Sequence, residues 1–583
     1  MVDRKIHAPS AYLARGLENL LIITKETESS LVHWSSCLFA KSVGCFAVPS
    51  VLLGELLVEP LFLAKAFCQG VQKEVNYSVE RISKLALGIC CTPLSILKAD
   101  GVSYLFLQRA PTQSEIRPFG VEKVYGVKVA DGIHYPHSVE DIQNLVLLAK
   151  KEQRKITIVG TGFSQGDQTA PLDKNDLVID LRNLKDVQFV PGSNHNLVKV
   201  SAGATWEVVQ QIVNKKGKSV IVKQASDVFS VGGSIAINCH GWEHAWGAIA
   251  STVESLEVID ATGTLKTISM QSSSIEDREL FRCMFGTLGY FGVIVSATLK
   301  LKDNEMYQEK GVKVPIREFD SYYKKNIQNN QKIPLLIGRL SLIDKPLSEV
   351  YFNTFEVCYD KHEKPLITPN FSIEPSRGQR IERIFLAAVG HLPNLLFKPL
   401  MRYFWQREQN LMQQGKIASR NEFLHPGIKS FIQLHQSDLY TQWLQEYFIS
   451  EEHLPSFLEY LGDVLEKNEV RLFNASIRPT PKDAISILPY AEKDRYAVVL
   501  SFHQLKTKQE MEKTKQWILQ VHQKLLSMGD KWYQAYMPFA TKEEFELSYG
   551  KEAVDKMRAL KKKFDPDNLF SNKHTAKYFD FFD

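Results

Sequence analysis

Two short glycine-bearing stretches constrain this chain more than any other feature of its sequence. In the first, residues 156–167, an apolar run typical of a β-strand ends at Gly160-Thr161-Gly162-Phe163-Ser164. In the second, residues 228–247, Gly232-Gly233 opens an apolar turn that can begin a helix. Because glycine tolerates positive φ and leaves the backbone bare, both stretches can direct N–H groups and a helix N-terminus toward a large anionic ligand.

Neither stretch is specific by itself. A dinucleotide fingerprint needs a third glycine three residues after Gly162, where this chain has Gln165. A P-loop is excluded because no Lys-Ser or Lys-Thr pair follows. Each stretch alone fits an ordinary tight turn equally well. What distinguishes them from turns is the order of further motifs along the chain.

Six ordered motifs between residues 124 and 301 resemble the FAD-binding domain of the vanillyl-alcohol oxidase/p-cresol methylhydroxylase superfamily (PCMH type). They lie at residues 132–142, 160–164, 177–181, 200–206, 231–234 with 240–241, and 286–294. The resemblance implies FAD as the cofactor, held by a two-subdomain domain. The residues implied in cofactor binding are Gly160, Thr161, Gly162, Phe163, Ser164, Gln165, Gly166, Asp167, Ser226, Phe229, Gly232, Gly233, Ser234, Asn238, Cys239, His240, Gly241, Gly289, Ile294 and Tyr533.

Within the superfamily, residues 160–167 and 237–241 look closest to the aldonolactone oxidases and the decaprenylphosphoryl-ribose oxidase, which act on sugar-like alcohols. The run 563–570, KFDPDNLF, is similar to the motif that closes the flavin domain. Residues 445–449, 474–478 and 532–536 resemble uncharacterised bacterial FAD-linked oxidoreductases. That last similarity implies no particular substrate.

Local patterns predict an α+β fold with an antiparallel sheet in a cap domain. Helical spacing appears at residues 139–152, 206–214, 381–414 and 507–528, and strand patterns at 156–159, 177–181, 197–200, 256–259, 293–301, 350–357, 469–477 and 496–502. We therefore predict an apolar N-terminal helical region (1–118), the FAD-binding domain (119–302), the cap or substrate domain (303–530) and a C-terminal segment that completes the site and returns to the FAD domain (531–583).

The N-terminal region leaves two interpretations open. Its longest uncharged run, residues 42–54, is shorter than the roughly 20 residues needed to span a bilayer. It therefore fits either a helical layer packed on the flavin domain or a hairpin in a membrane interface. The chain's eight cysteines show no CxxC or Cys/His ligand spacing, which argues against a zinc site. We predict no metal and a cytoplasmic protein, with peripheral membrane contact through the N-terminal region as the alternative.

Charge excludes one class of partner. The formal net charge of +5 over 583 residues gives no case for nucleic acid, which needs a clustered basic face. We expect a small-molecule or lipid-linked substrate instead. The electron acceptor stays open.

The resemblance places His240 near the flavin ring, where it can stabilise negative charge or help to take a hydroxyl proton. A histidine that merely holds the loop is the alternative. From the cap side we predict Tyr533 and Tyr536 in the active site. Tyr536 stands where the decaprenylphosphoryl-ribose oxidase pattern has a lysine, so the same substrate is in doubt. Arg478 and His503 are the candidate neighbours that would let Tyr533 act as a base.

Covalent attachment of the flavin is not expected. Relatives that attach FAD through histidine often carry that histidine where this chain has Phe163. His195 lies in a polar, turn-rich run and is expected to be exposed, and His244 to be packed between Trp242 and Trp246. Cys239 keeps a cysteinyl link open, but its neighbours match the noncovalent relatives better.

The predicted chemistry is hydride transfer from a CH–OH carbon to the flavin N5 atom. An enzyme acting on a carbon–carbon double bond, as in sterol reductases of the superfamily, is the first alternative. A noncatalytic flavin-fold binding protein is the second. It ranks last because Gly160, Gly162, Gly232, Gly233 and His240 are all present.

Overall fold

The computed structural model describes residues 133–342, 345–358, 366–368, 394–425, 440–505 and 507–580. Apart from residues 394–398, these belong to one compact unit of the chain. The predicted helical or membrane-associated region at residues 1–118 lies outside the described residues. Within the described ranges, no helix is long and apolar enough to cross a membrane.

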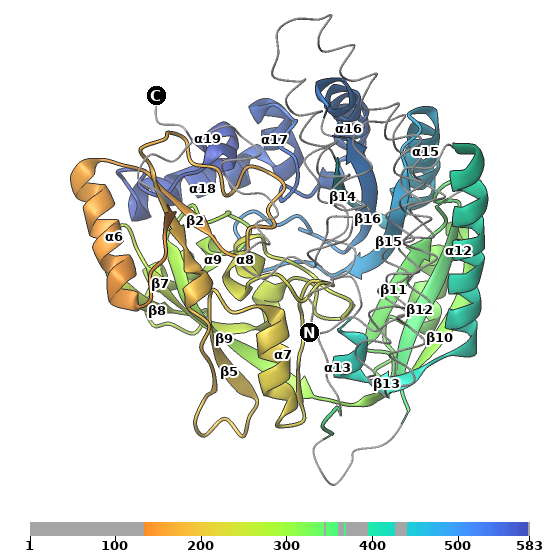
Figure 1. Cartoon of the computed structure of the whole chain (residues 1–583), viewed down its shortest axis with the longest axis horizontal. Coiled ribbons are helices and arrows are strands. Elements are labelled where there is room, and N and C mark those ends of the chain that lie inside the picture. The colour runs from red at the N-terminus through yellow and green to blue at the C-terminus, as the bar shows by residue number, and fades with distance from the viewer. Residues whose placement is uncertain are drawn as a thin grey trace, which may run out of the picture. The chain divides into compact units, whose positions relative to one another are not determined.

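A small parallel sheet with the strand order β1-β3-β2 opens the described chain (Figure 1). Its elements are β1 Ile133–His134, helix α6 Val139–Glu152, β2 Ile156–Val159 and β3 Leu177–Asp180. Helix α6 begins where Ser138 and Asp141 cap each other's backbone N–H groups. It buries Ile142, Val146 and Ala149, which share one helix face. The helix predicted at 139–152 and the strand predicted at 156–159 are confirmed.

An antiparallel sheet follows, with the order β4-β5-β9-β7-β8 and with β6 paired to β9. Its strands are β4 Val187–Phe189, β5 Leu197–Ser201, β6 Lys218–Val220, β7 Val253–Ile259, β8 Leu265–Ile268 and β9 Val293–Asp303. The helices in this part are α7 Trp206–Asn214, α8 Val231–Ala236 and α9 Ile275–Cys283. The predicted helix at 206–214 is confirmed, and so are the three predicted strands, although β7 and β9 run further than predicted.

The third sheet is antiparallel and has the order β13-β10-β12-β11-β15-β16-β14-β17. Its strands are β10 Met306–Pro315, β11 Leu335–Leu340, β12 Glu349–Val357, β13 Ile417–Ser419, β14 Tyr440–Ile449, β15 Leu472–Thr480, β16 Arg495–Leu505 and β17 Lys531–Trp532. The predicted antiparallel sheet is confirmed, but it has more strands than predicted. Its assignment to a cap domain stays a prediction. The strand predicted at 469–477 begins three residues late, because Glu469 adopts a φ of 52° that ends the preceding helix in a left-handed turn.

Around β14 and β16, one face of this third sheet is covered by helices (Figure 1). The helix at residues 394–414 instead contacts Arg339 and Tyr351, which point to the other face. The helices of this region are α10 Phe319–Asn326, α12 Asn394–Gln414, α13 Arg420–Phe423, α15 Leu454–Lys467 and α16 Lys508–Met528. Tyr447 of β14 packs on Phe457 of α15, and Phe502 of β16 packs on Trp517 of α16. Because side chains alternate along a strand, Glu446 of β14 points to the opposite face.

The C-terminal segment returns to the first sheet through α17 Lys542–Tyr549, α18 Lys551–Phe564 and α19 Lys573–Tyr578. The Ile156 N–H donates to the Leu569 carbonyl at 2.8 Å, and the Ser571 N–H donates to the Ile156 carbonyl at 3.1 Å. Lys561 is fully buried and donates to the Phe570 carbonyl at 2.8 Å and to the Asp565 carboxylate at 2.7 Å. These bonds fix the chain's end beside β2 and the first glycine loop.

Candidate active site

The two glycine-bearing stretches meet in the structure. The Ser230 N–H donates to the Thr161 hydroxyl at 3.3 Å. The rings of Phe163 and Phe229 meet edge to face at 5.5 Å between centroids. The first loop follows β2 and the second leads into α8, so residues about 70 positions apart in sequence form one backbone surface.

The first loop offers a row of unused donors. In the described chain, no backbone N–H from Thr161 to Gln165 donates a hydrogen bond to another protein group. Gly162 has a φ of 75°, a conformation that glycine adopts without a steric penalty. Backbone donors that lack protein partners in such a loop match the pyrophosphate of a dinucleotide cofactor.

The second loop differs from the first, because the N–H groups of Val231, Gly232 and Ser234 already donate to protein carbonyls. The Gly232 N–H donates to the Ala202 carbonyl at 2.9 Å, and a Cβ at Gly232 would lie 2.7 Å from the Ala202 Cβ, so only glycine fits. Close by in sequence, the Ser226 hydroxyl is buried without a protein partner in the described structure. The bare backbone at Gly232 leaves room for a bound FAD, and a polar group of that cofactor would satisfy the Ser226 hydroxyl.

The side chains of several predicted cofactor-binding residues form hydrogen bonds with other protein groups. The Gln165 side chain donates to the Gln442 carbonyl at 3.0 Å and accepts from the Leu444 N–H at 2.9 Å, so it ties the first loop to β14. The Asn238 side chain donates to Asp483 at 2.8 Å. The remaining predicted positions lie in or beside the two loops, or at β9: Ser164, Gly166, Asp167, Gly233, Ser234, Gly241, Gly289 and Ile294.

The thiol of Cys239 is poorly suited to attachment. It is 2% exposed, and burial raises its pKa to about 12, so it stays protonated at neutral pH. His195 is exposed on the β4–β5 turn, as predicted. His244 is buried as predicted and lies 2.6 Å from the Ile333 carbonyl, although Trp246 beside it is 39% exposed rather than packed.

His240, Glu446 and Tyr536 form the polar centre of the site. The His240 Nε2 atom is in hydrogen-bond contact with one oxygen of the Glu446 carboxylate. The Tyr536 hydroxyl donates to the other oxygen at 3.4 Å. His240 comes from the loop after α8, Glu446 from β14 and Tyr536 from the segment after β17. All three are buried or half-buried, so one carboxylate joins the second glycine-bearing stretch to the eight-stranded sheet.

The two tyrosines are hydrogen-bond donors at neutral pH. Burial, followed by the Glu446 charge, raises the pKa of Tyr536 well above its usual value. Burial likewise raises the pKa of Tyr533, whose hydroxyl donates to the Ile237 carbonyl at 2.6 Å. The Tyr533 ring packs against Phe448 and Tyr490. A phenol that keeps its proton cannot act as the base that the sequence suggested for Tyr533.

Arg478 joins this centre and His503 does not. Arg478 and Glu446 lie on one face of the sheet, and burial lowers the pKa of Arg478 while the Glu446 charge raises it. His503 is four residues along β16 from Val499, the cross-strand partner of Glu446, which is about 13 Å along a strand. Its ring stacks on Phe473 instead.

The sequence did not single out Glu446, although it accepts bonds from two of the predicted residues. It lies inside the run 445–449 that carries part of the family resemblance. A carboxylate inside a strand-like run that ends in Tyr447, Phe448 and Ile449 was the available signal. Its partner His240 is about 200 residues away, and only strand pairing brings the two together.

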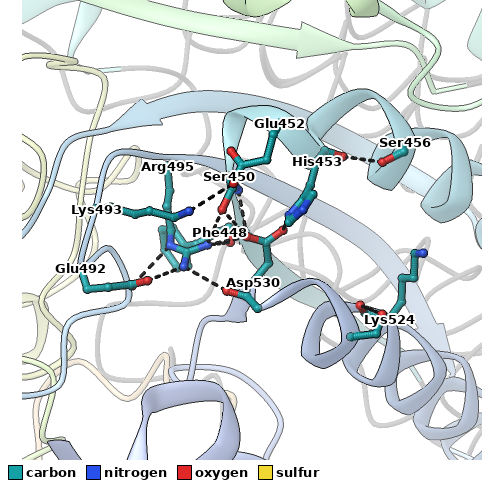
Figure 2. A network of polar contacts seen from close by, with 12 residues as sticks. Phe448, Ser450, Glu452, His453, Ser456, Glu492, Lys493, Arg495, Lys524 and Asp530 are labelled. Carbon is teal, nitrogen blue, oxygen red and sulfur yellow. Dashed lines mark hydrogen bonds and ion pairs between the residues drawn. The ribbon is translucent and has the colours of Figure 1, made fainter.

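A second polar network holds the strands that carry these residues (Figure 2). The Asp530 carboxylate accepts from Arg495 at 2.5 Å and from the Ser450 N–H at 3.0 Å, and lies 2.9 Å from His453 Nδ1. Ser450 directly follows β14 and Asp530 directly precedes β17. The network therefore fixes the ends of the strands next to Glu446 and Tyr533.

Comparison with known proteins agrees with this site. Residues 130–269 match the family model "FAD binding domain", and residues 374–578 match "D-arabinono-1,4-lactone oxidase". L-gulonolactone oxidase of Bos taurus is 23% identical over 453 residues, which cover 76% of this chain and 94% of that protein. D-arabinono-1,4-lactone oxidase of Yarrowia lipolytica is 30% identical over 168 residues, 28% of this chain and 31% of that protein. The chain thus matches about a third of the length of that fungal relative.

The fold, the two loops and these matches together define an FAD-linked oxidoreductase. Residues 130–269 are similar to FAD-binding domains, and the chain as a whole is similar to the aldonolactone oxidases. The predicted cofactor, FAD, is confirmed. The matches favour the oxidase interpretation over a carbon–carbon reductase or a noncatalytic binding protein.

Proposed function

We propose that the protein oxidises a CH–OH carbon of a sugar-derived lactone or a related polyhydroxylated molecule, with noncovalently held FAD. The observation that carries this proposal is the buried carboxylate of Glu446, bonded by His240 and Tyr536 beside the flavin-binding loops. The substrate class rests on the relatives, two of which are named as lactone oxidases. The bound flavin supplies the acceptor for the hydride.

The protein's own groups handle the proton. As the carbon loses hydride, the hydroxyl proton needs an acceptor, and the Glu446–His240 pair is the basic group of the centre. Tyr536 donates a hydrogen bond to the second carboxylate oxygen. This bond fixes the orientation of the carboxylate, so that few lone pairs of Glu446 remain free to accept a proton. Tyr533, Phe448 and Tyr490 form an aromatic wall that keeps water from the pair.

The test is Glu446→Gln. This change keeps the size of the side chain and one acceptor oxygen but removes the charge that takes the proton. We expect the anaerobic rate of flavin bleaching by L-gulonolactone or D-arabinono-1,4-lactone to fall by about 10²- to 10⁴-fold. FAD content, measured from the visible spectrum, should stay at the wild-type level.

Glu451→Gln is the matched control, because Glu451 is exposed just after β14 and pairs with Lys324. Its bleaching rate should equal that of the wild type. Bleaching by Glu446→Gln at the wild-type rate would exclude this carboxylate as the proton acceptor. A wild-type protein that is yellow but bleached by neither lactone nor any alditol would exclude the proposed substrate class.

A further inference from the structure

The sheet face that carries Glu446 holds a row of further polar side chains. Arg339 of β11 is the cross-strand partner of Ser476 of β15. Ser476 in turn pairs with Val499 of β16, and Val499 pairs with Glu446 of β14. Side chains directly opposite each other point to the same face of a sheet. Neighbouring strands lie about 4.8 Å apart, so about 10 Å separates Glu446 from Ser476.

Arg478 lies two residues beyond Ser476 on the same face. Its cross-strand partner is Ala497, which in turn pairs with Phe448. The residues between the arginine and the β14 strand are therefore short and apolar: Ala497 in one row and Val499 in the next. No bulky side chain of β16 separates Arg478 from Glu446.

Two side chains on this face, Arg478 and Ser476, lack protein partners in the described chain. Arg478 is 9% exposed, and among the described residues its guanidinium donates no hydrogen bond. The Ser476 hydroxyl is fully buried and equally unpartnered there. The Arg339 Nε atom is also buried without an acceptor in the described chain, and that side chain's ion pair is a 3.7 Å contact with Glu408.

The buried guanidinium of Arg478 calls for negative charge, and the half-buried Arg339 adds positive charge on the same face. A buried cation without a partner is strongly unfavourable, and nearby like charges add to the cost. Burial lowers the pKa of Arg478, Glu446 raises it, and Arg339 lowers it further. Glu446 cannot satisfy Arg478 by hydrogen bonding alone, since its oxygens already contact His240 and Tyr536.

We propose that Arg478, Ser476 and Arg339 form a binding subsite for an oxyanion, a carboxylate or a phosphate, carried by the sugar-derived substrate. This inference rests on the proposed function and narrows its substrate class. The oxyanion is bound unchanged. At the other end of the molecule the C–H hydrogen leaves as hydride to FAD, the hydroxyl proton passes to Glu446–His240, and a carbonyl forms.

The first test is equilibrium binding, which does not depend on turnover. FAD-loaded protein is titrated with D-gluconate, D-glucitol 6-phosphate and the neutral D-glucitol, and binding is followed by the flavin spectrum and by the melting temperature. We expect at least one of the two anions to bind about 10- to 100-fold more tightly than D-glucitol, since a charge-assisted bond contributes a factor of that size. The anion that binds more tightly identifies carboxylate or phosphate as the ligand.

Arg478→Gln should remove that preference, and Arg478→Lys should restore part of it for phosphate, because lysine binds phosphate as a point charge but lacks the planar fork. Arg317→Gln is the matched control, because Arg317 is exposed near α10. Equal binding of the anions and D-glucitol by the wild type would overturn the inference. So would an Arg478→Gln protein that keeps the preference but loses FAD or shifts the flavin potential, because the guanidinium would then serve the cofactor.

Failure of the subsite and failure of the proposed function give different results. Turnover of a neutral lactone without any preference for anions leaves the proposed function standing and overturns the subsite. Binding of anions through Arg478 without bleaching of the flavin by any CH–OH compound refutes the proposed function instead.

Discussion

Two buried arginines of the same sheet have opposite surroundings. Arg495 of β16 donates to the Asp530 carboxylate at 2.5 Å, to the Phe448 carbonyl at 3.2 Å and to the Gly529 carbonyl at 3.1 Å (Figure 2). The Arg478 guanidinium of β15 donates to no group in the described chain. Since both side chains are nearly removed from water, the difference lies in their partners alone.

The comparison separates structural charge from functional charge. A buried charge whose donors are all satisfied stabilises one arrangement of the backbone, here the ends of β14 and β17. A buried charge without partners costs stability, and it is retained where a ligand provides the partner. Arg495 therefore has a structural role, whereas Arg478 has the surroundings of a binding residue.

The largest expected effect is the loss of the satisfied arginine. Arg495→Met leaves the fully buried Asp530 carboxylate without its main partner, so we expect the free energy of unfolding to fall by about 3–5 kcal/mol. The measurement is the urea midpoint of the FAD-loaded protein, followed by tryptophan fluorescence. If the eight-stranded sheet unfolds in a transition of its own, the decrease in unfolding free energy is expected in that transition.

Lys493→Met is the control two residues away. Lys493 pairs with Glu452 at 3.2 Å, and both side chains are 53% exposed, so the change should cost at most about 1 kcal/mol. A double variant, Arg495→Met with Asp530→Leu, should recover part of the loss because it removes both charges. A loss in Arg495→Met no larger than that in Lys493→Met would show that the network of Figure 2 does not hold the strands.

His522 is another buried side chain without hydrogen-bond partners in the described ranges, but unlike Arg478 it is uncharged. Neither ring nitrogen of His522 has a hydrogen-bond partner in the described structure, and the ring stacks on Trp532 at 4.1 Å. Burial lowers the pKa of His522 to about 3, from an ordinary 6.5. An imidazole that stays neutral can be buried without a ligand, so an unpartnered atom alone does not indicate a binding site.

The pH dependence of the unfolding free energy tests whether His522 is neutral in the folded protein. Because the depressed pKa means that unfolding takes up a proton between pH 6.5 and 3, the stability from His522 is complete above pH 6.5 and falls as the pH is lowered. At pH 5 the loss is about 2 kcal/mol, or about 1.4 kcal/mol per pH unit. His522→Phe should reduce the slope of unfolding free energy against pH by one proton. His195→Gln, at an exposed turn, should leave the slope as it is. An unchanged slope in His522→Phe would mean that the imidazole is charged in the folded protein.

The two glycine-bearing loops could be predicted from the sequence because their signals are local. Gly160, Gly162 and Gly232 leave the backbone without side chains at these positions. The neighbouring apolar runs predict the strand and the helix that flank them. In the folded protein the two loops lie together, as the hydrogen bond between Thr161 and Ser230 shows. The helices at 139–152 and 206–214 were equally local, since a capping residue and an apolar stripe define them.

The cap side was less accessible because its chemistry depends on strand register. Glu446 meets His240 only through a pairing of strands far apart in sequence, and a shift of one residue would turn Glu446 to the helix-covered face. His503 shows the same limit, because it shares the face of Glu446 and yet lies about 13 Å along the strand. Sequence patterns identify the residue types on such a sheet but not which of them become neighbours.

The smallest expected effect concerns Arg478 and gives the comparison its sharpest form. Arg478→Met replaces an unpartnered buried cation by an apolar side chain of similar length, so without ligand the free energy of unfolding should stay the same or rise by about 1 kcal/mol. In the presence of a bound anion at about 100 times its dissociation constant, the wild type should gain about 2.7 kcal/mol and the variant much less. The measurement is the urea midpoint with and without D-gluconate or D-glucitol 6-phosphate. A fall of several kcal/mol in Arg478→Met without ligand would give Arg478 the same structural role as Arg495, and the difference between the two arginines would disappear.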